Sequence, residues 1–209
     1  MTAPAPTRAP TLALIDYQAG NLHSVANALR AAGSEPAITA DPDVVARADR
    51  IVLPGVGAFG ACAAALRAVP GLVAALERRV LSEGAPFLGI CVGMQLMADR
   101  GEERGRHAGL GWIGGTGGRL EPATMAAKVP HMGWNDVRPL APHPLIEAGE
   151  AYFLHSFAFK GEGVIAATDH DGPVTAAIGR DNLVGVQFHP EKSQRYGLDL
   201  LSRFLEWRP

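Results

Sequence analysis

Cysteine is scarce in this chain, which has only Cys62 and Cys91 among its 209 residues. Two cysteines cannot build the disulfide framework of a small secreted domain, and a free thiol suits a reducing compartment. No uninterrupted apolar run approaches the ~18 residues that a membrane-spanning helix needs. The first ten residues are small and proline-rich and lack the apolar core of a signal peptide, so we expect a disordered tail at 1–10. These absences favour a cytoplasmic protein with no membrane segment.

A strong excess of charge of either sign is also lacking. The chain has 19 Lys and Arg residues against 21 Asp and Glu residues, and its formal net charge is −2. Proteins that bind nucleic acid or anionic membrane surfaces usually carry basic clusters, and this sequence has none, so neither partner is expected. An apolar content of 47% with 19% charged residues is typical of a globular enzyme. The length favours one domain, at 11–209, over two.

Short apolar runs alternate with longer amphipathic runs in the first half of the chain. The pattern predicts strands at 11–16, 50–53 and 87–90 and helices at 21–32, 58–67 and 72–81. Strands that alternate with helices are typical of right-handed βαβ units, in which helices cover both faces of a mostly parallel sheet.

The second half of the chain has a different pattern. A long glycine-rich stretch at 105–118 predicts a loop, and 193–207 predicts a closing helix. Between them, short β-type runs predict strands at 119–121, 127–129, 152–155, 164–167, 174–178 and 183–188. We expect these strands to be antiparallel additions to the parallel sheet. The predicted fold class is therefore α/β, with three layers and a mostly parallel central sheet.

Cys91 stands at the centre of the segment GICVGMQ, between Gly89 and Gly93. An apolar run precedes it and helix-forming residues follow it, which is the arrangement of a nucleophile elbow. Such a turn exposes one side chain and directs the backbone N–H of the next residue, Val92, towards a developing oxyanion. A free cysteine is more often a small buried hydrophobic residue, and Cys62, in an alanine-rich helix, is interpreted in that way. The flanking glycines favour a catalytic nucleophile at Cys91.

His189 and Glu191 lie at the end of the apolar segment GVQFHPE. Side chains at i and i+2 of a strand share a face, so the Glu191 carboxylate can orient and polarise the imidazole. A solvated histidine at a strand end would be the usual interpretation of His189 alone. With Glu191 beside it, His189 is the candidate general base for Cys91 and the candidate acid for a leaving amine.

The segment PGVGAFG, at 54–60, contains a G-x-G-x-x-G pattern between a predicted strand and a predicted helix. That pattern can bind a dinucleotide, but it follows the second strand and not the first, and the nearby acid Glu77 falls inside a helix pattern. We favour the alternative that Gly55, Val56 and Gly57 lie over Cys91 and supply a second oxyanion N–H. No cofactor is therefore expected, and no sequence pattern indicates a metal site.

Five segments carry a resemblance to a known family, in the order PGVGAF, GICVGMQ, PHMGWN, YFLHSF and GVQFHPEKS. The chain resembles the class I (triad-type) glutamine amidotransferases from about Leu12 to Leu205. Within that family it resembles the glutaminase subunits of imidazole glycerol phosphate synthases, which act in histidine biosynthesis. GICVGMQ with FHPE is typical of the whole family, whereas PGVGAF, PHMGWN and HPEKS are typical of this subunit.

The resemblance implies a three-layer α/β fold and a catalytic triad of Cys91, His189 and Glu191. It implies that glutamine is hydrolysed to glutamate and ammonia through a cysteine thioester, without a cofactor. The residues that it implies for binding glutamine are the side chain of Gln95 and the backbone around Gly55, Gly57, Ser156 and Phe157.

The resemblance also implies a partner, a cyclase subunit with a (β/α)8 barrel. This partner would receive the ammonia and make imidazole glycerol phosphate and an aminoimidazole carboxamide ribonucleotide. The residues implied at or near the partner-facing surface are Asn21, His131, Trp134, Asn135, Tyr152 and Lys192. Taken alone, the polar and aromatic residues of PHMGWN and YFLHSF would be interpreted as structural groups at strand ends.

Two other functions compete with this one. A glutaminase subunit of another synthase, of the anthranilate or carbamoyl phosphate type, would share the triad chemistry, but PHMGWN together with PGVG disfavours it. A non-catalytic regulatory module of the same fold is disfavoured because Cys91, His189, Glu191 and Gln95 are all intact.

Overall fold

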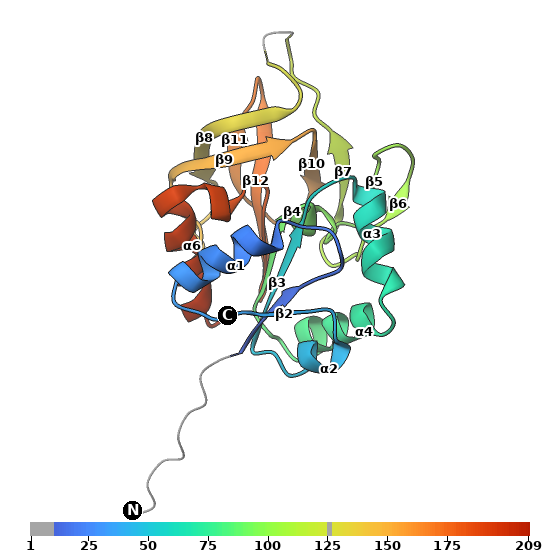
Figure 1. The fold of residues 1–209 in the computed structure, drawn as a ribbon. Coiled ribbons are helices and arrows are strands. Elements are labelled where there is room, and N and C mark those ends of the chain that lie inside the picture. The colour runs from blue at the N-terminus through green and yellow to red at the C-terminus, as the bar shows by residue number, and fades with distance from the viewer. Residues whose placement is uncertain (1–10, 125–126) are drawn as a thin grey trace, which may run out of the picture.

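A nine-stranded sheet runs through the centre of the structure, in the order β2-β1-β3-β4-β13-β12-β11-β8-β9 (Figure 1). The computed structural model describes residues 11–124 and 127–209, so the tail predicted at 1–10 lies outside the described residues. The strands of this sheet are β1 (Leu12–Ile15), β2 (Ala37–Thr39), β3 (Arg50–Gly55), β4 (Phe87–Cys91), β8 (His131–Pro139), β9 (Gly149–His155), β11 (Val164–Asp169), β12 (Pro173–Arg180) and β13 (Leu183–Val186). Pairs from β2 to β13 are parallel, and pairs from β13 to β9 are antiparallel. The predicted parallel sheet with antiparallel additions is confirmed.

Helices cover both faces of the parallel half of the sheet. Figure 1 shows α1 and α6 on one side of β3 and β4, and α3 with α4 on the other. The helices are α1 (Leu22–Ala31), α2 (Pro42–Val45), α3 (Phe59–Ala68), α4 (Leu72–Glu77), α5 (Val92–Gln95) and α6 (Gln194–Glu206), with a π-helical turn at Arg78–Ser82 and a 3₁₀ turn at Pro190–Lys192. The three-layer α/β fold class is therefore confirmed. The sequence pattern did not predict β2 and α2, because both are too short for a periodicity to be recognised.

A second, four-stranded sheet has the order β10-β7-β5-β6. Its strands are β5 (Arg100–Gly101), β6 (His107–Ala108), β7 (Gly115–Arg119) and β10 (Phe157–Gly161). The loop predicted at 105–118 is therefore wrong for β6 and for most of β7. Glycine serves close packing there: a Cβ on Gly115 would lie 2.5 Å from Cζ of the Phe159 ring. Composition alone cannot distinguish a glycine needed for close approach from one needed for a turn.

The strand β8 departs most from the predicted strands. The run at 127–129 forms no strand, and the strand begins instead at His131. Gly133, Asn135 and Asp136 have low β propensity, which hid this strand in the sequence. Antiparallel pairing with β9 along His131–Val137 overrides that low propensity.

Buried apolar residues from both halves of the chain form one core cluster. In α6, Leu201 and Phe204 are fully buried as predicted, whereas Leu198 and Leu205 are half-buried against the core. A single domain at 11–209 stays a prediction.

The described residues contain neither a single helix that could span a membrane nor a cluster of metal-binding side chains. No single helix there combines the length and the apolar character of a membrane span, although the bent pair of Phe59–Ala68 and Leu72–Ser82 meets both criteria when taken together. No group of three or more His, Cys, Asp or Glu side chains in the described part of the chain is arranged to hold a metal ion.

Candidate active site

Three adjacent parallel strands bring the candidate site together at their carboxyl ends. The strands β3, β4 and β13 are neighbours in the sheet, and the register places Gly55, at the end of β3, opposite Cys91, at the end of β4. His189 follows shortly after the end of β13, which pairs with β4. Sites in α/β sheets commonly form at this edge because the segments that follow neighbouring strands meet there.

Cys91 forms the tight turn between β4 and α5. Its backbone has φ = 54° and ψ = −113°, and such a strained conformation of a non-glycine residue costs about 1–3 kcal/mol. Glycines on both sides permit the turn: a Cβ on Gly93 would overlap the Leu53 carbonyl oxygen, and a Cβ on Gly89 would lie 2.8 Å from the Gly93 carbonyl oxygen. The segment therefore has the geometry of a nucleophile elbow.

Gly93→Ala is expected to lower the free energy of unfolding by about 3 kcal/mol or more, because the added methyl group overlaps the backbone of β3 and no rotamer change can relieve it. Gly118→Ala is the matched control, since a Cβ there has no atom within 4 Å. Its effect should stay within about 0.5 kcal/mol. Urea denaturation measures both values, and a Gly93→Ala protein as stable as the wild type would contradict this account of the turn.

The His189 imidazole interacts with both the Glu191 carboxylate and the Cys91 thiol. Its Nδ1 is 2.9 Å from Glu191 Oε1, and both side chains are almost fully buried. The ring and the Cys91 thiol line the same cavity and interact electrostatically. Burial alone lowers the pKa of His189, but the hydrogen bonds and charges of Cys91 and Glu191 outweigh burial and raise it to about 10. The site therefore favours a protonated imidazole beside the thiol.

The backbone of His189 is held by two neighbouring elements. Its N–H donates to the Tyr152 carbonyl oxygen of β9 at 2.9 Å. Its carbonyl oxygen accepts at 2.7 Å from the hydroxyl of Ser193, which precedes α6, and that hydroxyl also accepts from the Tyr152 N–H at 2.9 Å. Ser193 is not among the predicted site residues. Its hydroxyl holds the backbone of His189 in place next to β9.

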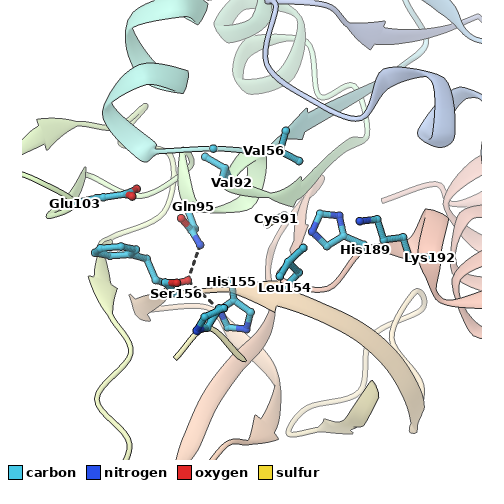
Figure 2. A pocket seen from close by; sticks show the side chains of 13 residues that line it. Val56, Cys91, Val92, Gln95, Glu103, Leu154, His155, Ser156, His189 and Lys192 are labelled. Atoms are coloured by element: carbon cyan, nitrogen blue, oxygen red, sulfur yellow. Dashed lines mark hydrogen bonds between the residues drawn. The ribbon is translucent and has the colours of Figure 1, made fainter. Parts of the chain in front are cut away.

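Two buried glutamine side chains connect to the thiol. Gln187 Nε2 donates to Cys91 Sγ at 3.6 Å, and Gln95 Nε2 donates to Gln187 Oε1 at 3.0 Å. Gln95 Nε2 also donates to the Phe157 carbonyl oxygen at 2.8 Å (Figure 2). Gln187 is not among the predicted site residues, although the i, i+2 rule that joins Glu191 to His189 extends back to it.

A cavity of about 310 Å³ opens over the thiol, and Figure 2 shows its side chains. The predicted residues in its lining are Val56, Gly57, Cys91, Val92, Gln95, Ser156, Phe157, His189 and Lys192. The lining residues that were not predicted as site residues are Glu103, Pro130, Leu154 and His155. Lys192, predicted near the partner-facing surface, thus lies in the cavity close to His189.

The cavity has a charged side chain at each end, Glu103 and Lys192 (Figure 2). Glu103 Oε2 accepts from the backbone N–H of Phe59, the first residue of α3, at 2.8 Å. Lys192 Nζ lies 5.8 Å from the centroid of the Tyr152 ring. Glu103 can therefore pair with the ammonium group of a free amino acid bound in the cavity. Glu103 carries no sequence signal because it lies in the loop between β5 and β6.

The glycine-rich segment after β3 is held close to the elbow. A Cβ on Gly55 would lie 2.8 Å from the Tyr17 hydroxyl, so only glycine fits there. The Cys62 thiol, in α3, donates to the Val56 carbonyl oxygen at 3.4 Å. Because the C=O and N–H of a trans peptide point in opposite directions, the N–H of Gly57 is directed away from Cys62. The structural interpretation of Cys62 thus extends to holding this segment.

The residues predicted near the partner surface fall into two groups. Trp134 is exposed and Tyr152 half-buried on the outer face of β8 and β9, and Asn21 is half-buried just before α1. His131 and Asn135 face inward, and His131 is only 4% exposed. The side chain of His131 therefore contacts the interior of this subunit and not its surface.

Comparisons with known proteins agree with this geometry. A family model described as "Glutamine amidotransferase class-I" matches residues 13–206. The imidazole glycerol phosphate synthase subunit HisH of Zymomonas mobilis is 62% identical over 206 residues, covering 95% of this chain and 97% of the relative. The subunit HisH of Rhodopseudomonas palustris is 51% identical over 215 residues, covering 95% and 100%. A crystal structure described as a glutamine amidotransferase has a TM-score of 0.72 at 18% identity and covers 93% of this chain and 97% of its own, which supports the fold. The chain belongs to the class-I glutamine amidotransferase family.

Proposed function

We propose that this protein is the glutaminase subunit of an imidazole glycerol phosphate synthase and acts in histidine biosynthesis in the cytoplasm. The observation that carries the proposal is the contact of Cys91 with His189 and of His189 with Glu191 at a cavity. A thiol, a base and an orienting carboxylate are what thioester chemistry requires. The relatives described above are subunits of this synthase by name, which favours it over a synthase of the anthranilate or carbamoyl phosphate type.

In the proposed reaction, Cys91 Sγ attacks the side-chain amide carbon of glutamine after its proton has passed to His189. The backbone N–H of Val92 and a second N–H, from Val56 or Gly57, stabilise the oxyanion. His189 then protonates the amine, the C–N bond breaks, and ammonia leaves a γ-glutamyl thioester on Cys91. Water deprotonated by His189 attacks the thioester and releases glutamate. Glu191 keeps the imidazole oriented and stabilises its positive charge.

Glutamine fits the cavity by charge and by hydrogen bonding. We place its α-ammonium group at Glu103 and its α-carboxylate at the backbone N–H groups of Ser156 and Phe157. Both N–H donors of Gln95 are already used within the protein, so Gln95 has only its carbonyl oxygen left for the substrate. Gln95 would therefore accept from the substrate and not donate to it.

The outer face of β8 and β9 is the proposed surface for the cyclase subunit, a (β/α)8 barrel. Met132, Trp134 and Leu154 are 66%, 47% and 36% exposed on this face, and Met132 pairs directly with Leu154 across the strands. Exposed apolar patches of this kind are typical of protein interfaces. Leu154 also lines the cavity, so a partner that covers the patch would close the site against loss of ammonia.

Trp134→Ala is expected to weaken association with the cyclase about tenfold or more, because a truncated aromatic anchor at an interface commonly costs about 2 kcal/mol. Leu81→Ala is the matched control, since Leu81 is 46% exposed in the π-helical turn after α4, away from β8 and β9. Isothermal titration calorimetry measures both dissociation constants. Equal affinities for the two variants would place the interface elsewhere.

Glutamate release measured with and without the cyclase and its acceptor tests the function. We expect the complex with acceptor to release glutamate much faster than the isolated chain, and a glutamine-like electrophile to label Cys91. Stimulation by the acceptor of another synthase instead would reassign the pathway. Failure of both release and labelling in the complete complex would identify a non-catalytic module.

A further inference from the structure

A continuous line of hydrogen bonds runs from β8 towards the thiol. It begins at Asn135, whose Nδ2 is 3.0 Å from His131 Nε2, and continues from His131 Nδ1 to His155 Nε2 at 3.0 Å. His155 Nδ1 lies 3.0 Å from the Phe157 carbonyl oxygen (Figure 2). That oxygen also accepts from Gln95, which belongs to the glutamine pair beside the thiol. Both imidazoles in the line are buried.

The hydrogen bond between the two histidines runs in one direction only. A carbonyl oxygen accepts, so His155 Nδ1 carries a hydrogen. Burial lowers the pKa of His155 to about 3 despite its bond to Phe157, so the ring is neutral and Nε2 keeps a lone pair. His131 must therefore donate from Nδ1. Burial, with the charge of His170, lowers the pKa of His131 to about 4, so its own Nε2 accepts from Asn135.

The same reasoning determines the orientation of the side-chain amides of Gln95 and Gln187. Gln95 uses one N–H for the Phe157 carbonyl oxygen and the other for Gln187 Oε1. Gln187 accepts at Oε1, so it must present its Nε2–H to Cys91 Sγ. The side chain of Gln187 is completely buried, so water cannot replace this donor. One carbonyl oxygen thus determines both histidine tautomers and both amide orientations.

We propose that Gln187 is a positioning residue whose amide N–H stabilises the Cys91 thiolate. The Phe157 carbonyl oxygen sets the direction of that amide through Gln95, and the neutral pair of His131 and His155 holds this oxygen in place. A hydrogen bond to an ionised group is roughly twice as strong as one between neutral groups, so the donor helps most once the thiol has lost its proton. The inference rests on the proposed glutaminase function, because it concerns the nucleophile of that reaction.

Alkylation of Cys91 tests the donor directly. In the full-length chain, Gln187→Met keeps the volume and removes the N–H, and we expect iodoacetamide at pH 7 to react with Cys91 about tenfold more slowly. The pH profile of the reaction should also move to higher pH, because the thiolate has lost a hydrogen-bond donor. Mass spectrometry of the modified peptide separates Cys91 from Cys62. The other titratable groups that interact with the thiol, on His189, Tyr17 and Cys62, are unchanged in this variant.

Kinetics in the complex separate positioning from substrate binding. Gln187 is not among the described residues that line the cavity, so we expect kcat for glutamine hydrolysis to fall about tenfold while KM stays unchanged. Asn182→Leu is the matched control, because it removes a half-buried amide at the opposite end of β4 and β13. We expect this control to alter stability and to leave the alkylation profile unmoved.

A second pair of variants tests the histidine line and applies even if Gln187→Met fails to fold. His131→Phe keeps an aromatic ring stacked on Phe153 but removes the donor to His155, and we expect alkylation to slow about threefold. His131→Gln restores an N–H donor and should recover most of the rate. Wild-type alkylation profiles in the folded variants would overturn the inference. If wild-type Cys91 itself resists the glutamine-like electrophile in the complex, the proposed function fails instead.

Discussion

Cys91→Ala is expected to abolish glutamine-dependent synthesis and to leave ammonia-dependent synthesis at the wild-type rate. The thioester needs the sulfur that contacts His189, and no other described cysteine lines the cavity. Loss of a nucleophile that acts together with its base costs about 10⁴-fold or more in kcat. Ammonia added to the medium bypasses this subunit, because the cyclisation belongs to the partner. Formation of imidazole glycerol phosphate from glutamine and from ammonium salts, in the same complex, measures both activities.

Cys62→Ala is the matched control for the cysteine substitution. Cys62 is also buried, and its thiol holds the Val56 carbonyl oxygen, so its loss disturbs the glycine-rich segment but not the nucleophile. We expect glutamine-dependent synthesis in this variant to fall no more than about tenfold, since one neutral hydrogen bond contributes about 1 kcal/mol. Loss of ammonia-dependent synthesis in a folded Cys91→Ala complex would contradict the division of labour between the two subunits.

The parallel half of the fold was predictable because its signals are local. Buried strands such as β1, β3 and β4 are continuous apolar runs, and each connecting helix has its own periodicity. The antiparallel half depends on partners that are distant in sequence. In β8, polar residues and Gly133 form a strand because β9 pairs with them, and in β7 glycines are required by a neighbouring ring. Neither cause is visible in a single window of sequence.

The residues of the candidate site also divide into those that have a local sequence signal and those that lack one. Residues in distinctive local patterns, the elbow at Cys91 and the pair of His189 and Glu191, were found, and the structure brings them into contact. Glu103 was missed because it reaches the site through tertiary packing, and Gln187 because its i, i+2 relation to His189 does not by itself point to the thiol. Their assignment therefore depends on geometry. The catalytic and binding roles of all these residues stay predictions until the variants are measured.

The inward face of β8 and β9 connects the two functional surfaces of the subunit. Trp134 and Tyr152 pair on the outer face, with ring centroids 6.1 Å apart, while His131 and His155 pair on the inner face. A partner that presses on the outer face therefore acts on the same two strands that carry the hydrogen-bond line. The partner can therefore influence the thiol through β8 and β9 alone.

His189→Ala is expected to reduce glutamine-dependent synthesis about as much as Cys91→Ala. Without the imidazole, the thiol has no base for its proton and the leaving ammonia has no acid, and each role is worth about 10²–10⁴-fold. Glu191→Gln should be milder, because the amide oxygen can still accept from His189 Nδ1 in nearly the same geometry. Ammonia-dependent synthesis should persist in both variants, which provides the internal control.

The pH profile distinguishes the lost charge from the lost orientation in Glu191→Gln. The carboxylate helps to raise the pKa of His189, so the neutral amide lets the imidazolium lose its proton at lower pH. The alkaline limb of kcat/KM should therefore move to lower pH. Glu191 Oε2 is buried without a hydrogen-bond partner among the described residues, so the new NH₂ group placed there costs about 1–3 kcal/mol of stability. An unshifted alkaline limb in Glu191→Gln would show that the charge of Glu191 does not act through His189. If Glu191→Gln were as inactive as His189→Ala, the carboxylate would do more than orient the base.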